Sequence, residues 1–209
     1  MGYDEQYFYP ETNRTYDETI KVGFVARLTE KKGWRDFIAA YEILRAQTDI
    51  DVQFQLVGYG IDAEKVSEQV AAVNQKLGDE KLQFLGKKAP DTLGDFYRSL
   101  DLFAFPTQYF ESFGLVGIES LACGTPVIGS DIGGIPSYLT DGENGFLIEP
   151  ENANDIAQAV IKYSQLDEIH KQKMHERATE SVTPYENDQV AANLQHVFER
   201  VIRKEWGHA

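Results

Sequence analysis

The chain has 209 residues, with 34 acidic and 20 basic side chains and a formal net charge of −14. This length fits one large domain or two small ones, and a content of 42% hydrophobic and 26% charged residues is typical of a folded globular protein. The acidic balance argues against nucleic acid as a partner, because proteins that bind a phosphate backbone cluster Lys and Arg. A small phosphate ligand, which needs only two or three local cations, is compatible with it.

The cysteine count and the distribution of apolar residues indicate the compartment. Cys123 is the single cysteine, which excludes an intramolecular disulfide and a multi-cysteine metal site. No apolar run approaches the roughly 18 residues of a membrane span. The first 18 residues are polar and acidic and lack the apolar core of a signal peptide. We therefore expect a cytoplasmic protein without direct membrane insertion.

The pattern along the chain predicts an α/β fold. Residues 1–19 show no period and are interpreted as a linker or entering segment. Strands are predicted at 20–27, 52–58, 82–86, 101–106, 126–130 and 145–148, and helices at 34–47, 63–78, 91–100 and within 114–124. From about residue 154 to 206 the pattern is helical, with a break near Thr183-Pro184. Alternating strands and helices favour a Rossmann-like parallel sheet over 20–185 with helices on both faces, followed by a C-terminal helix in 186–209.

Ligands of such sheets bind beyond the carboxyl ends of the strands. Arg27 ends the first predicted strand and Lys32 precedes the first helix, so both cations are expected at this edge, where they can hold a diphosphate. Lone cations near a strand end are, however, usually solvated surface residues. Gly133-Gly134 follows the strand at 126–130; glycines there usually form a turn, but two in a row leave room for a ligand.

The segment 106–146 is the densest in candidate residues. Glu111 and Glu119 are separated by seven residues, and Gly114 between them opens a helix whose free N–H groups and dipole favour an anion. Glu119, in the second turn of that helix, could accept hydrogen bonds from two adjacent ribose hydroxyls. Glu111, in the loop after a strand, suits a hydroxyl-rich substituent. Taken alone, the same residues are equally explained as two surface glutamates and a helix-opening glycine.

Three other patterns carry less weight. Asp49-Ile50-Asp51 has a spacing that binds metals in other proteins, but it lies at the amino edge of the predicted sheet, away from the other candidates. The four histidines lack metal-ligand spacing and are interpreted as surface or helix-packing residues. Gly58-Tyr59-Gly60 lacks the third glycine of a dinucleotide fingerprint. We therefore predict no metal site and no nicotinamide site.

Five segments together resemble a known family. They are FVARL–KKG (24–33), LVGYG (56–60), LQFLGK (82–87), FPT–ESFGLVGIESLACGTPVIGSDIGGIP (105–136) and DGENGFLIEP (141–150). The chain is similar over nearly all of 20–165 to family 4 glycosyltransferases, the glycosyl transferases group 1. These are retaining enzymes that use nucleotide-sugar donors and have the GT-B fold of two Rossmann-like domains. The resemblance is to the C-terminal, donor-binding domain.

The resemblance implies a role for each candidate. Arg27 and Lys32 would bind the donor diphosphate and Glu111 the transferred sugar, which makes these three the expected catalytic residues. The expected donor-binding residues are Gly86 and Lys87 near the base, Phe113, Gly114 and Leu115 through their backbone N–H groups, and Glu119 at the ribose. Two positions depart from the family pattern: Ala26 stands where a glycine is common and Ser137 where a glutamate is usual, which leaves a role for residue 137 open.

The resemblance also implies a reaction. A UDP- or GDP-sugar would donate its sugar to a glycan, lipid or other acceptor in bacterial polysaccharide or glycoconjugate synthesis, without a metal or other cofactor. The acceptor would bind an N-terminal domain, which residues 1–19 are too short to build. The C-terminal segment, 186–209, would pack on that domain. The N-terminal domain could also bring the protein to the inner face of the membrane. Alternatives are a nucleotide-sugar-binding module or inactive subunit of a two-chain transferase. An epimerase or a phosphorylase of the same architecture is disfavoured by the two spaced glutamates.

Overall fold

The structure, a computed structural model, describes residues 2–12 and 14–206. Within these residues, six strands form one parallel sheet in the order β3-β2-β1-β4-β5-β6. The strands are β1 (Ile20–Arg27), β2 (Val52–Tyr59), β3 (Leu82–Phe84), β4 (Leu102–Phe105), β5 (Val127–Ser130) and β6 (Gly145–Ile148). This order is that of the doubly wound dinucleotide-binding fold, so the predicted Rossmann-like sheet is confirmed.

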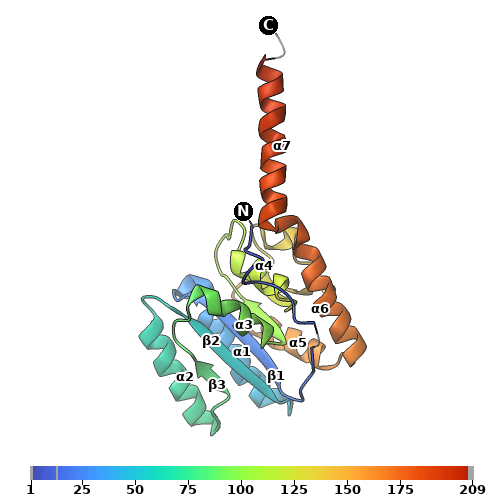
Figure 1. Ribbon diagram of the computed structural model, residues 1–209. Coiled ribbons are helices and arrows are strands. Elements are labelled where there is room, and N and C mark those ends of the chain that lie inside the picture. Colours follow the sequence, from blue (N-terminus) through green and yellow to red (C-terminus); the bar gives the residue numbers. More distant parts are fainter. Residues whose placement is uncertain (1, 13, 207–209) are drawn as a thin grey trace.

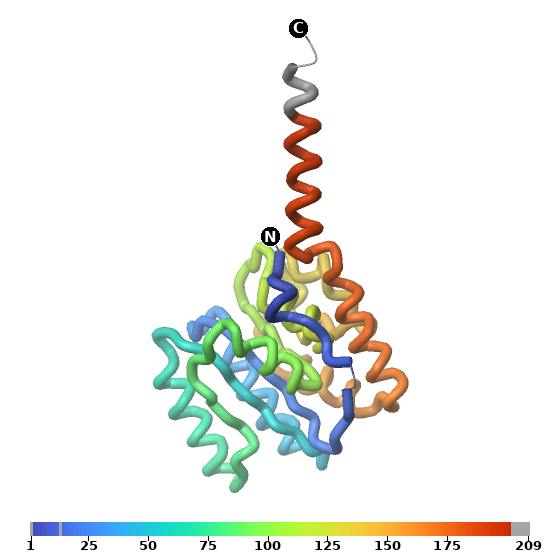
Figure 2. Tube along the Cα trace, in the orientation of Figure 1, coloured from blue at the N-terminus to red at the C-terminus, as the bar shows by residue number. Residues whose placement is uncertain are grey.

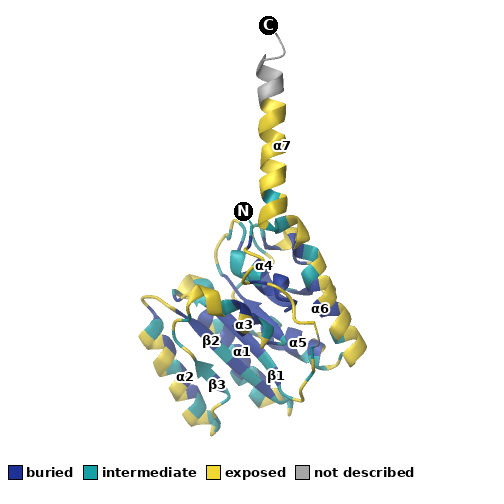
Figure 3. Ribbon diagram, in the orientation of Figure 1, coloured by how far each residue is buried: buried dark blue, intermediate teal, exposed yellow. Residues whose placement is uncertain are grey.

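Helices cover both faces of the sheet (Figure 1). One face carries α1 (Trp34–Gln47), α2 (Ala63–Leu77) and α5 (Ala153–Ser164), and the other carries α3 (Leu93–Arg98), α4 (Leu115–Ala122) and α6 (Glu168–Val182). Each face has its own apolar cluster, one around Phe37 and Phe54 and the other around Tyr97 and Phe103. Figure 3 shows the sheet buried between these two layers. Strands β4 and β5 are buried at every residue because both of their faces are covered.

Strand register decides which side chains meet at the carboxyl edge. β1 and β2 pair over their whole length, which places Arg27 beside Tyr59 at the last position of both strands. β3 ends at Phe84, two residues earlier than predicted. Gly86 has a positive φ of 68°, a left-handed conformation that is incompatible with a β-strand. The predicted helix 91–100 begins as a 3₁₀ turn at Pro90–Thr92 and becomes α-helical only in α3.

The N-terminal segment lies beside the start of the C-terminal helix, on one side of the sheet. The segment before β1 starts beside the base of α7 (Asn187–Trp206) and runs to the start of β1 (Figure 2). It is irregular, as predicted, but Tyr3 and Phe8 are buried against the domain, and Tyr3 forms a β-bridge with Glu186. Helix α7 follows a 3₁₀ turn at Thr183–Tyr185, where the break was predicted, and projects away from the body. Residues 207–209 of the predicted C-terminal segment lie outside the described part.

Candidate functional site

The carboxyl edge of the sheet contains a crevice between two neighbouring strands. β1 and β4 pair directly, but the chain leaves β1 toward α1 on one face and β4 toward α4 on the other. The loops that follow these two strands therefore diverge, which is the arrangement in which doubly wound sheets bind their ligands. Arg27 ends β1 at this point, and the loop 106–114 connects β4 to α4.

The structure brings the three predicted catalytic residues to this crevice. The Lys32 ammonium lies 2.6 Å from Oε2 of Glu111, and both side chains are partly exposed. Together with Arg27 they line a cavity of about 290 Å³. Its other walls are Thr29, Lys31, Thr107, Tyr109 and Phe110. Two or three cations and one carboxylate at a single cavity can hold a diphosphate beside a hydroxyl-rich group.

The turn that carries Lys32 and the loop that carries Glu111 form one unit. The backbone N–H of Gln108 donates to the Lys31 carbonyl at 2.9 Å, and its side-chain amide donates to Asp36 at 2.7 Å. Gly33 has a φ of 74°, and a Cβ at this position would lie 1.8 Å from the carbonyl oxygen of Pro106. Only glycine permits this approach. The Lys32–Glu111 pair is therefore fixed by the backbone on both sides.

The space left by Gly133-Gly134 is filled by the chain itself. The Gly134 N–H donates to the Glu111 carbonyl at 2.8 Å. A Cβ on Gly133 would lie 2.1 Å from that carbonyl oxygen, and a Cβ on Gly134 would lie 2.2 Å from the Ser112 carbonyl oxygen. These glycines thus seat the loop that bears Glu111. Ser137 closes the following turn by donating to the Gly134 carbonyl at 2.6 Å.

The N-terminus of α4 opens toward the same edge. Gly114 is its N-cap with a φ of 75°, and no side chain caps the first turn. The first N–H groups of a helix lack intrahelical partners, so those at Leu115 and beyond can bind an anion with the helix dipole behind them. The Phe113 ring lies edge-on to Tyr138 and Tyr185, with centroids 6.0 and 5.1 Å apart. This packing holds the Phe113 backbone at the start of the helix.

Glu119 lies in the second turn of α4, as predicted, and has a partner that sequence reasoning missed. The buried Tyr97 hydroxyl donates to its Oε2 at 3.1 Å. Burial raises the pKa of Glu119 to about 7, while the hydrogen bond from Tyr97 acts in the opposite direction. A half-buried carboxylate with free acceptor positions can bind two neighbouring hydroxyls. The sequence offers no sign of Tyr97, because a tyrosine on an amphipathic helix is indistinguishable from a core residue.

Gly86 and Lys87 lie in the turn after β3, at the carboxyl edge of the sheet and two strands away from β1. The Gly86 carbonyl accepts a hydrogen bond from the Gly58 N–H at 2.9 Å, which ties this turn to the end of β2. The Lys87 ammonium lies 5.0 Å from the centroid of the Tyr59 ring. Tyr59 is exposed and belongs to the LVGYG segment (56–60) of the family resemblance, for which the sequence predicts no contact of its own with the donor. An exposed aromatic ring therefore lies beside the turn predicted to face the base.

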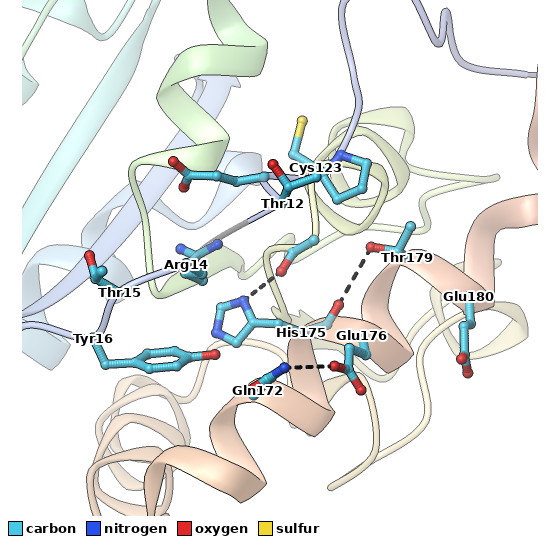
Figure 4. Close-up of a pocket in the computed structure, with 13 residues that line it drawn as sticks. Thr12, Arg14, Thr15, Tyr16, Cys123, Gln172, His175, Glu176, Thr179 and Glu180 are labelled. Carbon is cyan, nitrogen blue, oxygen red and sulfur yellow. Dashed lines mark hydrogen bonds between the residues drawn. The ribbon is translucent and has the colours of Figure 1, made fainter.

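A larger cavity, of about 520 Å³, lies elsewhere, between the N-terminal segment, the end of α4 and α6 (Figure 4). Cys123 and Gly124 line it, at the opposite end of α4 from Gly114 and roughly 12 Å away along the helix. None of the predicted site residues lines it. His175 at its wall donates through Nδ1 to the Gly124 carbonyl at 2.5 Å and accepts from the Tyr163 hydroxyl at 2.8 Å. Burial lowers the pKa of His175 to about 3, which suits a neutral packing residue.

Metal ligands and membrane spans are not evident in the described residues. No group of three or more His, Cys, Asp or Glu side chains there could hold a metal ion. Asp51 of the Asp-x-Asp segment accepts from Thr19 at 2.6 Å and pairs with Lys81. No helix in the same part of the chain combines the length and the apolar character that crossing a membrane requires.

Comparisons with known proteins identify the family and the fold of the chain. Residues 6–181 match the family Glycosyl transferases group 1. The D-inositol 3-phosphate glycosyltransferase of Corynebacterium aurimucosum is 29% identical, over 94% of this chain and 49% of that protein. The C-terminal domain of the group 1 protein LpcC from Francisella tularensis superposes with a TM-score of 0.77 and 26% identity, over 89% of this chain and all of that one. HepE of Anabaena, solved with UDP and glucose, gives a TM-score of 0.70 and 26% identity, over 86% and 49%.

The chain spans about half the length of the curated relatives it matches. The LpcC domain, all of which the superposition covers, is the C-terminal domain of a group 1 glycosyltransferase. The family match covers the whole sheet and every residue of the crevice. The chain therefore belongs to the glycosyl transferases group 1 and has the fold of a GT-B C-terminal domain.

Proposed function

We propose that this chain is the donor-binding half of a retaining, metal-independent glycosyltransferase that uses a UDP- or GDP-sugar. The observation that carries the proposal is the crevice at the carboxyl edge. Its cavity is lined by two cations, Arg27 and Lys32, and by the carboxylate of Glu111. The loop that carries Glu111 leads to the uncapped N-terminus of α4 at Gly114, and Glu119 lies in the second turn of that helix. HepE, a structural neighbour, was solved with UDP, which supports a uridine nucleotide as the first candidate.

The reaction follows from the charge distribution of the crevice. When the bond between sugar and diphosphate breaks, negative charge grows on the leaving diphosphate. Arg27, Lys32 and the N-terminus of α4 stabilise that charge and take the part that a metal ion plays elsewhere. Lys32 is paired with Glu111 at 2.6 Å, so a diphosphate that attracts the ammonium frees the carboxylate to accept hydrogen bonds from the sugar hydroxyls.

The nucleoside of the donor binds beside the diphosphate, between α4 and the turn after β3. Glu119 accepts from the ribose hydroxyls, and the base lies against the turn at Gly86 and Lys87. The exposed Tyr59 ring beside this turn offers a stacking surface for the base. Recognition by one ring and a backbone turn is compatible with either uracil or guanine.

Helix α7 supports the proposal of a second, acceptor-binding half. Its exposed apolar side chains follow the spacing i, i+3, i+4, i+7 along one side: Leu194, Val197, Phe198 and Val201. Such a stripe marks a helix face that packs against other protein. We assign this face to an N-terminal domain that binds the glycan, lipid or other acceptor, in line with relatives of about twice the length. Bacterial polysaccharide or glycoconjugate synthesis is the setting that we propose.

Calorimetric titration with UDP, GDP and their nucleosides tests the proposal. Glu119→Ala should weaken binding of both nucleotide and nucleoside, because each charge-assisted hydrogen bond contributes roughly 1.5–3 kcal/mol. Arg27→Ala and Lys32→Ala should weaken the diphosphate far more than the nucleoside. Lys76→Ala, which removes an exposed cation of α2 paired with Glu42, is the matched control and should change neither.

Three outcomes would contradict the proposal. Equal losses for diphosphate and nucleoside in the Arg27 and Lys32 variants would show that these cations do not touch phosphate. A strict requirement for magnesium, revealed by loss of binding in EDTA, would contradict metal independence. If donor binds but no added N-terminal half supports transfer, the chain is a nucleotide-sugar-binding module or an inactive subunit instead.

A further inference from the structure

We propose that Tyr97 is a positioning residue for Glu119: its hydroxyl holds one carboxylate oxygen so that the other is presented to the ribose. The inference rests on the proposed function, because it assigns a second residue to the same nucleoside site. Tyr97 lies on α3 and Glu119 on α4, so the hydrogen bond between them joins two helices of the same face.

Tyr97 is itself held rigidly. Its side chain is fully buried, and its ring lies edge-on to Phe103 with centroids 5.1 Å apart. Its carbonyl accepts from the Thr125 hydroxyl at 2.7 Å, in the connection between α4 and β5. Phe8 of the N-terminal segment packs behind the ring, at a centroid distance of 6.1 Å. The hydroxyl therefore has little freedom to seek another partner.

The hydrogen bond from Tyr97 fixes the orientation of the Glu119 carboxylate. A phenol hydroxyl buried this completely needs an acceptor, and Glu119 Oε2, at 3.1 Å, is the one that the described residues supply. An ionised carboxylate offers about four lone-pair sites on two oxygens. With one site on Oε2 taken by Tyr97, the carboxylate plane is fixed and Oε1 stays available. Preorganisation of this kind increases affinity because the side chain need not be ordered on binding.

The charge state of Glu119 depends on the same bond. Burial raises the pKa of Glu119 to about 7, whereas donation by Tyr97 favours the ionised form. Cys123 at the end of α4 is a second titratable group near Glu119, because the Glu119 charge contributes to the raised pKa of its thiol. Burial raises the pKa of that thiol to about 12, so it is neutral. Tyr97 is thus the side chain that keeps the carboxylate able to accept from ribose hydroxyls near neutral pH.

The variant Tyr97→Phe tests the proposal, with UDP as the probe. This variant keeps the packing of the ring and removes only the hydroxyl that donates the hydrogen bond to Glu119. Tyr41→Phe is the matched control, since that buried hydroxyl also donates to a carboxylate, Asp79 at 2.6 Å, but at the amino edge of the sheet. Dissociation constants are measured from pH 6 to pH 9 for both variants and the native chain.

In the native chain, affinity should fall as pH decreases through about 7, where Glu119 is protonated. In Tyr97→Phe the midpoint should move to higher pH by about one unit, which weakens binding at least five-fold at pH 7. A smaller loss should remain at pH 9, where Glu119 is ionised in both chains, because its carboxylate is no longer held in place before UDP binds. Tyr41→Phe should keep the native midpoint. A merely structural role of Tyr97 would lower the melting temperature of the variant without moving its pH profile, and an unmoved midpoint overturns the proposal.

A second measurement separates this inference from the proposed function. The Glu119 carboxyl is titrated by ¹³C NMR without nucleotide, and its signal is assigned by its loss in Glu119→Gln. A higher midpoint in Tyr97→Phe than in the native chain supports the positioning role even if UDP does not bind. Equal midpoints overturn it even if UDP binds well. Failure of UDP and GDP to bind the native chain at any pH refutes the proposed function alone.

Discussion

Replacement of Glu119 by Gln should stabilise the fold at alkaline pH while it weakens nucleotide binding. The pKa of this carboxyl rises from 4.5 to about 7 on folding because the side chain is buried. Between these two values the folded state holds a proton that the unfolded state has released. Stability therefore falls as pH rises through this window, and the loss is complete above about pH 7. Gln resembles the protonated acid and avoids the loss.

The expected gain can be worked out from the same pKa values. One pKa unit corresponds to about 1.4 kcal/mol, so a rise from 4.5 to about 7 gives an upper limit of about 3 kcal/mol at pH 8. The neutral amide still has to be buried, and its oxygen can accept from Tyr97 as the carboxylate does, so about 1–3 kcal/mol is the expected range. At pH 5 only about a quarter of the gain should remain.

Urea unfolding at pH 5 and pH 8 measures this directly. Glu64→Gln, an exposed position on α2, is the control and should show no pH-dependent gain. A gain of equal size at both pH values would show that charge burial is not its cause. No gain at pH 8 would refute the reasoning, because it would mean that Glu119 is ionised at no cost in the folded protein.

Two further predictions concern the loop and the completeness of the site. Gly133→Ala should lower the free energy of unfolding by about 1–3 kcal/mol, because φ is 61° and the new Cβ would clash with the Glu111 carbonyl oxygen. Gly142→Ala is the control and should be milder, because Gly142 has a similar φ of 77° but open space around the new Cβ. Equal losses of stability in the two variants would show that the clash with Glu111 is unimportant. The chain alone should bind donor but transfer no sugar to a matched acceptor, because one half cannot exclude water or hold the acceptor hydroxyl; efficient transfer by the chain alone would contradict this.

The fold could be predicted because the hydrophobic period of each segment agrees with the position of that segment in the sheet or in the helical layers. Ile20–Arg27 and Trp34–Gln47 have the bounds that their hydrophobic periods indicate, and the strand ends identify the edge that holds the site. The N-terminal segment was harder to interpret, since Tyr3 and Phe8 are isolated aromatics without a period. Their burial depends on the tertiary surface of the domain, which local sequence does not reveal.

The sequence predicted which end of the sheet its candidate residues would occupy, but not the contacts between them. Lys32 and Glu111 lie 79 positions apart, and no pattern in either segment indicates that they form an ion pair. The close approach of Gly133 to the Glu111 backbone likewise joins two loops that only the sheet order brings together. Tyr97 was missed because its position on α3 is that of an ordinary core residue, and its contact with Glu119 joins two separate helices. The Lys32–Glu111 contact depends on the pairing of β1 with β4, the Gly133–Glu111 contact on the pairing of β4 with β5, and the Tyr97–Glu119 contact on the packing of α3 against α4.

Mapping bound nucleotide by amide chemical shifts tests the central claim most directly, which is that the donor binds at the carboxyl edge. In ¹⁵N-labelled protein titrated with UDP, the largest changes should occur at Arg27, Gly86 and Lys87, and at the start of α4 from Gly114 to Glu119. Residues around the 520 Å³ cavity, such as Gly124 and His175, should change little. Changes that cluster at that cavity and spare the crevice would contradict the account.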